Sequence, residues 1–301
     1  MNLKQINDEY NNGLKNLTLF TKKQIENTYR MRGPTRNFFI RQAQNNYIKG
    51  LNQLITKRKS LLKQIGKLIN SAFIVGINYN KTNYALNGCI NDAMNMKQFV
   101  LARGCDKLLM MTDNEIFRPT KKNIIAGLTN LLLSTKDGET AMFYYSGHGT
   151  NVADIGGDET DSRDECLFTL DGQLILDDEL NMVIKNNLKE NTTLFILCDC
   201  CHSGTMIDLK YNYNEDTNNV KDADQPGRIY YISGCRDSQV SLESFIGGKV
   251  QGALTNAFTS SCLETISWKD LMTSIRYKLP NQTPQLSTSK QVDIVNEKCI
   301  F

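Results

Sequence analysis

Two stretches of the chain place reactive side chains directly after an apolar run. The stretch TAMFYYSGHGT (140–150) carries Ser146 and His148 at its end, and TLFILCDCCHSGT (193–205) ends in a cluster of Cys198, Asp199, Cys200, Cys201 and His202. The chain has only two histidines, and both lie at these two run ends. A cysteine nucleophile needs a base within hydrogen-bond reach, because the thiolate is the attacking species. The pairing predicts nucleophilic catalysis by a cysteine.

Strand geometry ranks the candidate cysteines. Alternate residues of a strand point to the same face, so Asp199 and Cys201 share one face while Cys200 and His202 share the other. His202 therefore points away from Cys201. The workable dyad is Cys201 with His148 from the neighbouring strand, and Cys200 is predicted to be a buried thiol.

The same alternation predicts the rest of the pocket. Ser146 lies on the face of His148, and both join Asp199 around one pocket. The backbone N–H groups of Gly149 and Cys201 are placed to form an oxyanion hole.

Two other interpretations of the cysteine cluster stay open. Cys198, Cys200, Cys201 and His202 could bind zinc, although alternation spreads them over two faces and no second ligand pair has the usual spacing. Alternatively, the cysteines belong to the core and the histidines cap turns.

The elements that position these residues form an alternating pattern. Short apolar runs predict strands at 71–79, 107–112, 140–146, 193–199 and 228–234, and amphipathic stretches predict helices at 91–103, 121–133 and 177–187. This predicts an α/β fold, with a mostly parallel β-sheet flanked by helices on both faces. Ligands bind at the carboxyl ends of such strands, where both reactive clusters fall. Polar stretches at 151–165 and 211–228 are predicted to be loops.

The front of the chain differs from the remainder in charge. Residues 1–70 carry 14 Lys and Arg against 3 Asp and Glu, whereas residues 71–301 carry 21 against 29. We predict a basic helical segment over 1–70 and a catalytic domain over 71–301. The segment could be a solvated helix pair, could bind nucleic acid or a membrane surface, or could dock on the acidic remainder of its own chain.

Targeting signals give a simple expectation. The start lacks a signal-peptide pattern and no apolar run approaches the length of a membrane helix, so we expect a cytoplasmic protein with no membrane partner. The nine cysteines are an odd number without a secretory signal, which favours reduced thiols.

The motifs together resemble the type I metacaspases, a family of caspase-like cysteine peptidases. The matching stretches are IVGINY (74–79), LNGCINDAMNM (86–96), FYYSGHGT (143–150), GDETDSRDE (157–165), LDDEL (176–180), DCCHSGTMIDL (199–209), ISGCRDSQVS (232–241), GALTNAF (252–258) and TPQLS (283–287). The resemblance implies a caspase-like fold and the dyad His148 and Cys201, and favours a monomer.

The resemblance also implies cleavage after Arg or Lys. The acidic specificity pocket would be formed by Asp92, Ser146 and Asp199, with Cys89 nearby. Carboxylates beside the nucleophile pair with a cationic side chain and repel an aspartate. From the residues alone, Asp92 is a surface helix residue or a helix cap.

Calcium is the implied cofactor. Many metacaspases require Ca²⁺, and its ligands would correspond to Asp164, Asp177, Asp178 and Asp208 here. Carboxylate oxygens suit this cation. Without the resemblance, the acidic stretch reads as a solvated loop, because it has no EF-hand pattern.

The front segment departs from the family, many of whose members begin with a Pro- and Gln-rich stretch. We expect the basic stretch TYRMRGPTR (28–36) to suit an acidic cleft. The hypothesis is autoinhibition by this arm, relieved by self-cleavage there or within 211–228.

The predicted function is thus a calcium-stimulated cysteine endopeptidase acting on proteins or peptides after Arg or Lys. One alternative is a catalytically silent interaction protein that uses its basic segment on nucleic acid or acidic partners, although we expect no nucleic-acid partner. Another is a caspase-like enzyme that cuts after Asp, which the charge of the pocket disfavours.

Overall fold

The computed structural model of the chain describes residues 3–65, 68–153, 163–200, 206–213, 218–220, 224–234, 243–246, 249–262 and 266–301. The chain divides into two compact units. The hairpin unit comprises Met1–Lys67 with Ala102–Gly104, and the sheet unit comprises Leu68–Leu101 with Cys105–Phe301.

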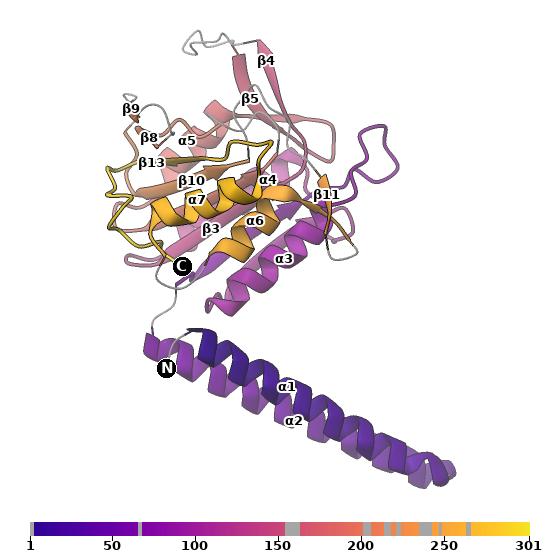
Figure 1. The fold of residues 1–301 in the computed structure, drawn as a ribbon. Helices are drawn as coiled ribbons and strands as arrows, with labels where there is room; N and C mark the ends of the chain where they lie inside the picture. The colour runs from indigo at the N-terminus through magenta and orange to yellow at the C-terminus, as the bar shows by residue number, and fades with distance from the viewer. Residues whose placement is uncertain are drawn as a thin grey trace. The chain divides into compact units, whose positions relative to one another are not determined.

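The hairpin unit contains two long helices that lie side by side (Figure 1). Helix α1 (Leu3–Glu26) is followed by the short 3-10 helix η1 (Asn27–Arg30), and α2 (Gly33–Ile65) returns along α1. The break falls at Met31 and Arg32, directly before Gly33 and Pro34. Gly33 has a φ of 64°, a left-handed conformation that glycine adopts at low cost, and proline is favoured at the start of a helix.

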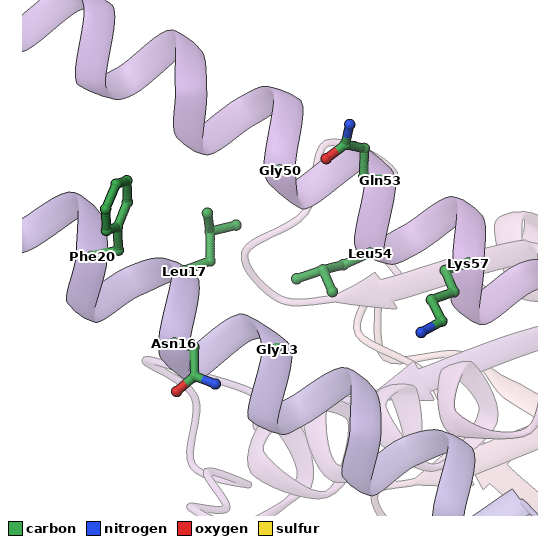
Figure 2. Close-up of a pocket in the computed structure, with 8 residues that line it drawn as sticks. All are labelled: Gly13, Asn16, Leu17, Phe20, Gly50, Gln53, Leu54 and Lys57. Carbon is green, nitrogen blue, oxygen red and sulfur yellow. The ribbon is translucent and has the colours of Figure 1, made fainter.

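The two helices pack by inserting leucines opposite glycines. A Cβ added to Gly13 would lie 2.6 Å from the Leu54 side chain, and one added to Gly50 would lie 2.8 Å from the Leu17 side chain. Figure 2 shows both leucines pointing into the space between the helices, beside a shallow groove that Phe20 also lines. This reciprocal packing fixes the antiparallel register of the hairpin.

The sheet unit is built on one eight-stranded sheet with strand order β2-β1-β3-β7-β10-β13-β8-β9. Its parallel strands are β1 (Ser71–Gly76), β2 (Lys107–Thr112), β3 (Thr140–Ser146), β7 (Thr193–Asp199) and β10 (Arg228–Ser233). The strands β8 (Tyr211–Tyr213), β9 (Asn218–Val220) and β13 (Gln285–Thr288) extend it by antiparallel pairs.

Helices cover both faces of this sheet (Figure 1). Helices α3 (Cys89–Ala102), α6 (Ala253–Ser261) and α7 (Trp268–Lys278) contribute to one buried apolar cluster, and α4 (Lys121–Ser134) and α5 (Asp177–Asn187) contribute to the other. Their apolar residues recur at helical spacing and bury one side of each helix. The predicted α/β architecture is confirmed.

Two short antiparallel sheets accompany the main sheet. One contains β4 (Gly149–Ala153), β5 (Arg163–Phe168) and β6 (Leu174–Leu176), and the other contains β11 (Glu243–Ile246) and β12 (Lys249–Gly252).

The prediction of loops at 151–165 and 211–228 was wrong in part, because β4, β5, β8 and β9 enter these stretches. Their polar residues pair as antiparallel strands, which need no continuous apolar run. Residues 154–162 of the predicted acidic loop lie outside the described residues.

The cysteines that the structure describes are free thiols. Across the described part of the chain, no helix combines the length and apolar character that crossing a bilayer requires.

Candidate active site

The two reactive stretches are neighbours in the sheet. Strands β3 and β7 pair in parallel, and their register sets Ser146 opposite Asp199. His148 follows Ser146 by two residues, and Cys201 likewise follows Asp199 by two. Each reactive residue therefore comes two positions after a member of this opposed pair. Cys201 and His202 lie outside the described residues.

Burial along β7 follows the predicted alternation. Phe195 and Leu197 belong to the apolar cluster on the α3 and α6 face, whereas Cys198 and Cys200 belong to the cluster on the α4 and α5 face. Cys200 is 1% exposed, so it is a buried thiol. Asp199 continues the series of Phe195 and Leu197 and points towards α6, as its hydrogen bonds below show.

His148 is held by backbone groups and aromatic rings. Its Nε2 lies 2.8 Å from the carbonyl oxygen of Tyr84, and because a carbonyl only accepts, Nε2 carries the proton. In the neutral imidazole, Nδ1 is then the nitrogen with the free lone pair. Its ring packs 4.9 Å from the Tyr79 ring, and its backbone N–H donates to the Tyr79 hydroxyl over 2.9 Å.

The strand β3 ends at Ser146, so alternation does not extend to His148. Ser146 Oγ donates to Asp92 Oδ2 over 3.2 Å, while the His148 ring contacts Tyr79 of the opposite cluster. Gly149, the predicted oxyanion donor, begins β4 opposite Leu167.

Two carboxylates meet at the N-terminus of α6. The Gly252 N–H donates to both Asp92 oxygens, at 2.9 Å from Oδ1 and 2.8 Å from Oδ2. The backbone N–H and hydroxyl of Thr255 donate to Asp199 Oδ2 over 2.9 Å and 2.7 Å. The helix N-terminus favours negative charge, and these donors keep both carboxylates fixed.

The two carboxylates lie so close to Gly252 that they leave no room for a side chain at this position. A Cβ on Gly252 would lie 2.2 Å from Asp199 Oδ2 and 2.8 Å from Asp92 Oδ2. Asp92, Ser146, Asp199 and Cys89 are each at most 5% exposed. Burial, and then the charges of Asp92 and Asp199, raise the pKa of the nearby Tyr144 well above its usual value.

The predicted calcium ligands lie on three segments. Asp164 is on β5, Asp177 and Asp178 form the first turn of α5, and Asp208 lies between β7 and β8. Asp164 and Asp177 are buried, Asp208 is half-buried and Asp178 is exposed.

Asp177 accepts two backbone hydrogen bonds. Its Oδ1 accepts the Asp178 N–H over 2.8 Å and its Oδ2 accepts the Glu165 N–H over 3.2 Å. Burial, followed by the charges of Asp208 and Asp164, nevertheless raises its pKa to about 6. Within the described residues, no group of three or more His, Cys, Asp or Glu side chains forms a metal site.

Four residues of the site were missed from the sequence: Tyr79, Tyr84, Gly252 and Thr255. The motif GALTNAF marks the last two, and the N-terminus of a helix is a signal for anion contacts. The role of Tyr84 depends on its carbonyl, which no side-chain pattern reveals.

Comparison with known proteins identifies the family. A family model described as "Metacaspase, peptidase C14 domain" matches residues 70–210. Metacaspase-2 of Arabidopsis thaliana is 37% identical over 62% of this chain and 50% of its own length. Metacaspase-1 of Schizosaccharomyces pombe is 30% identical over 74% of this chain and 68% of its own length.

A solved structure has a similar fold. A protein of Geobacter sulfurreducens aligns with a TM-score of 0.59 and 24% identity, over 77% of this chain and 97% of its own. The solved structure shows a shared α/β fold, and the family model and the two metacaspases identify the class of protein. The chain belongs to the metacaspase family.

Proposed function

We propose that this chain is an endopeptidase that cleaves after Arg or Lys, with Cys201 as nucleophile and His148 as general base. The observation that carries this proposal is the pair of buried carboxylates, Asp92 and Asp199, fixed around Gly252. Asp199 stands two residues before Cys201, so a residue bound at the nucleophile would have its side chain near a negative site.

The catalytic steps use the tautomer of His148. With Nε2–H donated to the Tyr84 carbonyl, Nδ1 can accept the proton of the Cys201 thiol. The thiolate then attacks the scissile carbonyl carbon, and backbone N–H groups of Gly149 and Cys201 stabilise the oxyanion. Loss of the amine, protonated by His148, leaves a thioester, and water hydrolyses it to release the acid and restore the thiol.

The charge of the pocket supports specificity for a cation. Guanidinium and ammonium groups form strong charge-assisted bonds with carboxylates that are already held in place. An acidic substrate side chain would meet two like charges in a buried site, where repulsion is weakly screened. This favours Arg or Lys over Asp.

We propose Ca²⁺ as an activator bound by Asp164, Asp177, Asp178 and Asp208. The donor type suits this cation, because these are hard oxygen ligands and Asp177 is a carboxylate whose ionisation is opposed by burial and by two neighbouring carboxylates. The described residues do not gather three of these side chains into one metal site, so the proposal requires that Ca²⁺ draws them together. A bound cation would supply the missing positive charge and link β5 to α5. The same first-turn carboxylates also suit the N-terminus of α5.

Self-processing is proposed at exposed basic residues. Arg30 and Arg32 flank the break between η1 and α2, where Met31 is extended. The remaining residues of the expected arm 28–36 are helical, so an extended inhibitory arm would require part of α2 to unfold. The segment 211–228 is the second candidate for self-cleavage.

We also propose that the enzyme is cytoplasmic and monomeric.

The test is a panel of fluorogenic peptides with Arg, Lys or Asp at the cleavage position, assayed with calcium and with chelator. We expect turnover of the Arg and Lys peptides, stimulated by calcium, and none of the Asp peptide. Cys201→Ala should abolish turnover and its matched control Cys200→Ala should retain most of it. The reverse pattern for the two cysteines, or cleavage only after Asp, would overturn the proposal.

A further inference from the structure

The end of the hairpin exposes an unusual group of apolar side chains. We call residues 19–41, the end of α1, η1 and the start of α2, the tip. Its large exposed apolar residues are Leu19 (55%), Phe20 (58%), Tyr29 (68%), Phe38 (63%) and Phe39 (38%). Among the hairpin side chains that the structure describes, one more large apolar group, Ile48, is exposed. Clustered apolar exposure of this kind marks an interaction surface.

The tip is also strongly cationic. Its basic residues are Lys22, Lys23, Arg30, Arg32, Arg36 and Arg41, against the single acidic residue Glu26. The other two acidic residues of the hairpin, Asp8 and Glu9, lie near the opposite end of α1, where Glu9 pairs with Lys57. Positive charge and apolar surface therefore coincide at one end of the hairpin.

The arrangement of the rings distinguishes between anionic partners. Single-stranded nucleic acid stacks its bases on open aromatic faces. Here the Arg36 guanidinium covers the Tyr29 ring at 5.5 Å, and the Phe38 and Phe39 rings pack edge to face at 5.5 Å. A bilayer interface instead accepts apolar wedges in any orientation, with Lys and Arg near the headgroups. A second copy of the tip would bring like charges together.

From these observations we infer that the tip is a docking surface for an anionic phospholipid bilayer. Binding would be peripheral: the Phe and Leu side chains enter the interface while the basic side chains pair with headgroup charge. This requires no spanning helix, so it is compatible with the lack of an apolar run of membrane length. It departs from the sequence expectation of no membrane partner, which rested on the absence of spanning segments, and takes up the membrane-surface alternative for the basic segment.

The test uses the full chain carrying Cys201→Ala, which cannot process itself if the proposed nucleophile is correct. Co-sedimentation is measured with phosphatidylcholine vesicles, with and without phosphatidylserine. We expect binding to the anionic vesicles only, weakening as salt is raised. The double variant Phe20→Ser/Phe38→Ser should bind at least tenfold more weakly. The matched control Ile116→Ser/Phe117→Ser, at 93% and 65% exposed positions of the sheet unit, should bind normally.

A second measurement reports insertion directly. The chain has one tryptophan, Trp268, which is fully buried, so Phe38→Trp adds a distinct fluorescent probe. Its emission should shift to shorter wavelength with anionic vesicles. The inference is overturned if wild-type protein does not bind these vesicles, if the Phe variant binds as well as wild type, or if single-stranded nucleic acid is bound more tightly than the vesicles.

A different observation concerns Asp113, directly after β2. Its Oδ1 accepts the Asn78 N–H over 2.8 Å and its Oδ2 accepts the Asn80 N–H over 2.9 Å. Between them, Tyr79 has a φ of 52°, a left-handed conformation that is unfavourable for a residue with a Cβ. Both carboxylate oxygens therefore clamp a strained residue whose ring and hydroxyl contact His148.

The same backbone segment also supports the second contact of His148, which is with the Tyr84 carbonyl. The Asn78 carbonyl accepts the Leu86 N–H over 2.8 Å, which closes the loop that carries Tyr84. We also infer, on the basis of the proposed role of His148 as base, that Asp113 is a positioning residue for the imidazole. It sets the tautomer by fixing Tyr79 and Tyr84 together.

The measurement is ¹⁵N NMR of the imidazole rings. The chain has two histidines, and the variant His202→Gln identifies which signals belong to His148. Wild-type His148 should be the Nε2–H tautomer, and Asp113→Ala should give a mixture with kcat at least tenfold lower and KM little changed. Asp113→Asn, which keeps one acceptor oxygen, should fall between. The exposed Asp137→Ala is the control. An unchanged tautomer in Asp113→Ala overturns the inference, whether or not wild type cleaves after Arg.

Discussion

Two groups of buried carboxylates in the sheet unit differ in what surrounds them. Asp92 and Asp199 receive N–H and hydroxyl donors from the start of α6. Asp177 also receives two N–H donors, yet burial and the charges of Asp208 and Asp164 beside it raise its pKa to about 6. The first group is held by donors from the start of α6, which suits it to pair with a cationic side chain. The second gains most from a bound cation, and the difference separates a proposed specificity pocket from a proposed regulatory site.

The largest effect is expected at Asp199. Asp199→Asn keeps the acceptor for Thr255 but removes the charge, and losing one partner of a buried charge pair costs about 2–5 kcal/mol. We expect kcat/KM for an Arg peptide to fall about 100-fold or more. A citrulline peptide, an uncharged analogue of Arg, serves as the control. An equal loss for both peptides would show that Asp199 acts only by capping α6.

A smaller loss is expected from Gly252→Ala, because the new Cβ would meet both carboxylates of the specificity pocket. Displacing them should lower kcat/KM for Arg peptides about tenfold, with a stability loss of about 1–3 kcal/mol from overpacking. The control is Gly138→Ala, where a Cβ meets open space but φ is 76°. It should lower the thermal midpoint without changing kcat/KM, and an equal loss of activity there would contradict the pocket's role.

The smallest expected effect is the pH dependence of the stabilisation by calcium. Since the folded-state pKa of Asp177 is raised to about 6, folding holds its proton more tightly than the unfolded chain does. Its contribution to stability is present below the unfolded pKa of about 3.9 and is lost as pH rises towards 6. Calcium should therefore raise the thermal midpoint by about 3 °C more at about pH 7 than at about pH 5.

Asp177→Asn is the matched variant for that measurement, and it should remove this pH dependence of the calcium effect. The exposed Asp178→Asn should keep most of it. A calcium effect that is the same at both pH values, or the same in Asp177→Asn, would contradict the assignment of Asp177.

Much of the fold could be predicted, because continuous apolar runs such as Thr140–Ser146 and Thr193–Asp199 define buried parallel strands. The short strands at Tyr211–Tyr213 and Asn218–Val220 could not, since they contain no continuous apolar run and Tyr211–Tyr213 joins the sheet through β13, which is far away in sequence. The same reason applies to the site. Asp92 and Gly252 are 160 residues apart and meet only through the fold.

Backbone groups set the second limit on how much of the site could be predicted from the sequence. The Tyr84 carbonyl orients His148, and the Gly252 N–H holds Asp92, so in each contact the partner of the functional side chain is a backbone group. Sequence patterns reveal side chains, so they do not show that His148 is oriented by a carbonyl oxygen.

The unbroken length of α2 has one more consequence. A helix of 33 residues extends about 50 Å, and the leucines set against Gly13 and Gly50 prevent the two helices from sliding. The hairpin therefore keeps its tip at a fixed distance from Ile65. Inserting or deleting whole turns in both helices would change the length of the hairpin by about 5.4 Å for each turn.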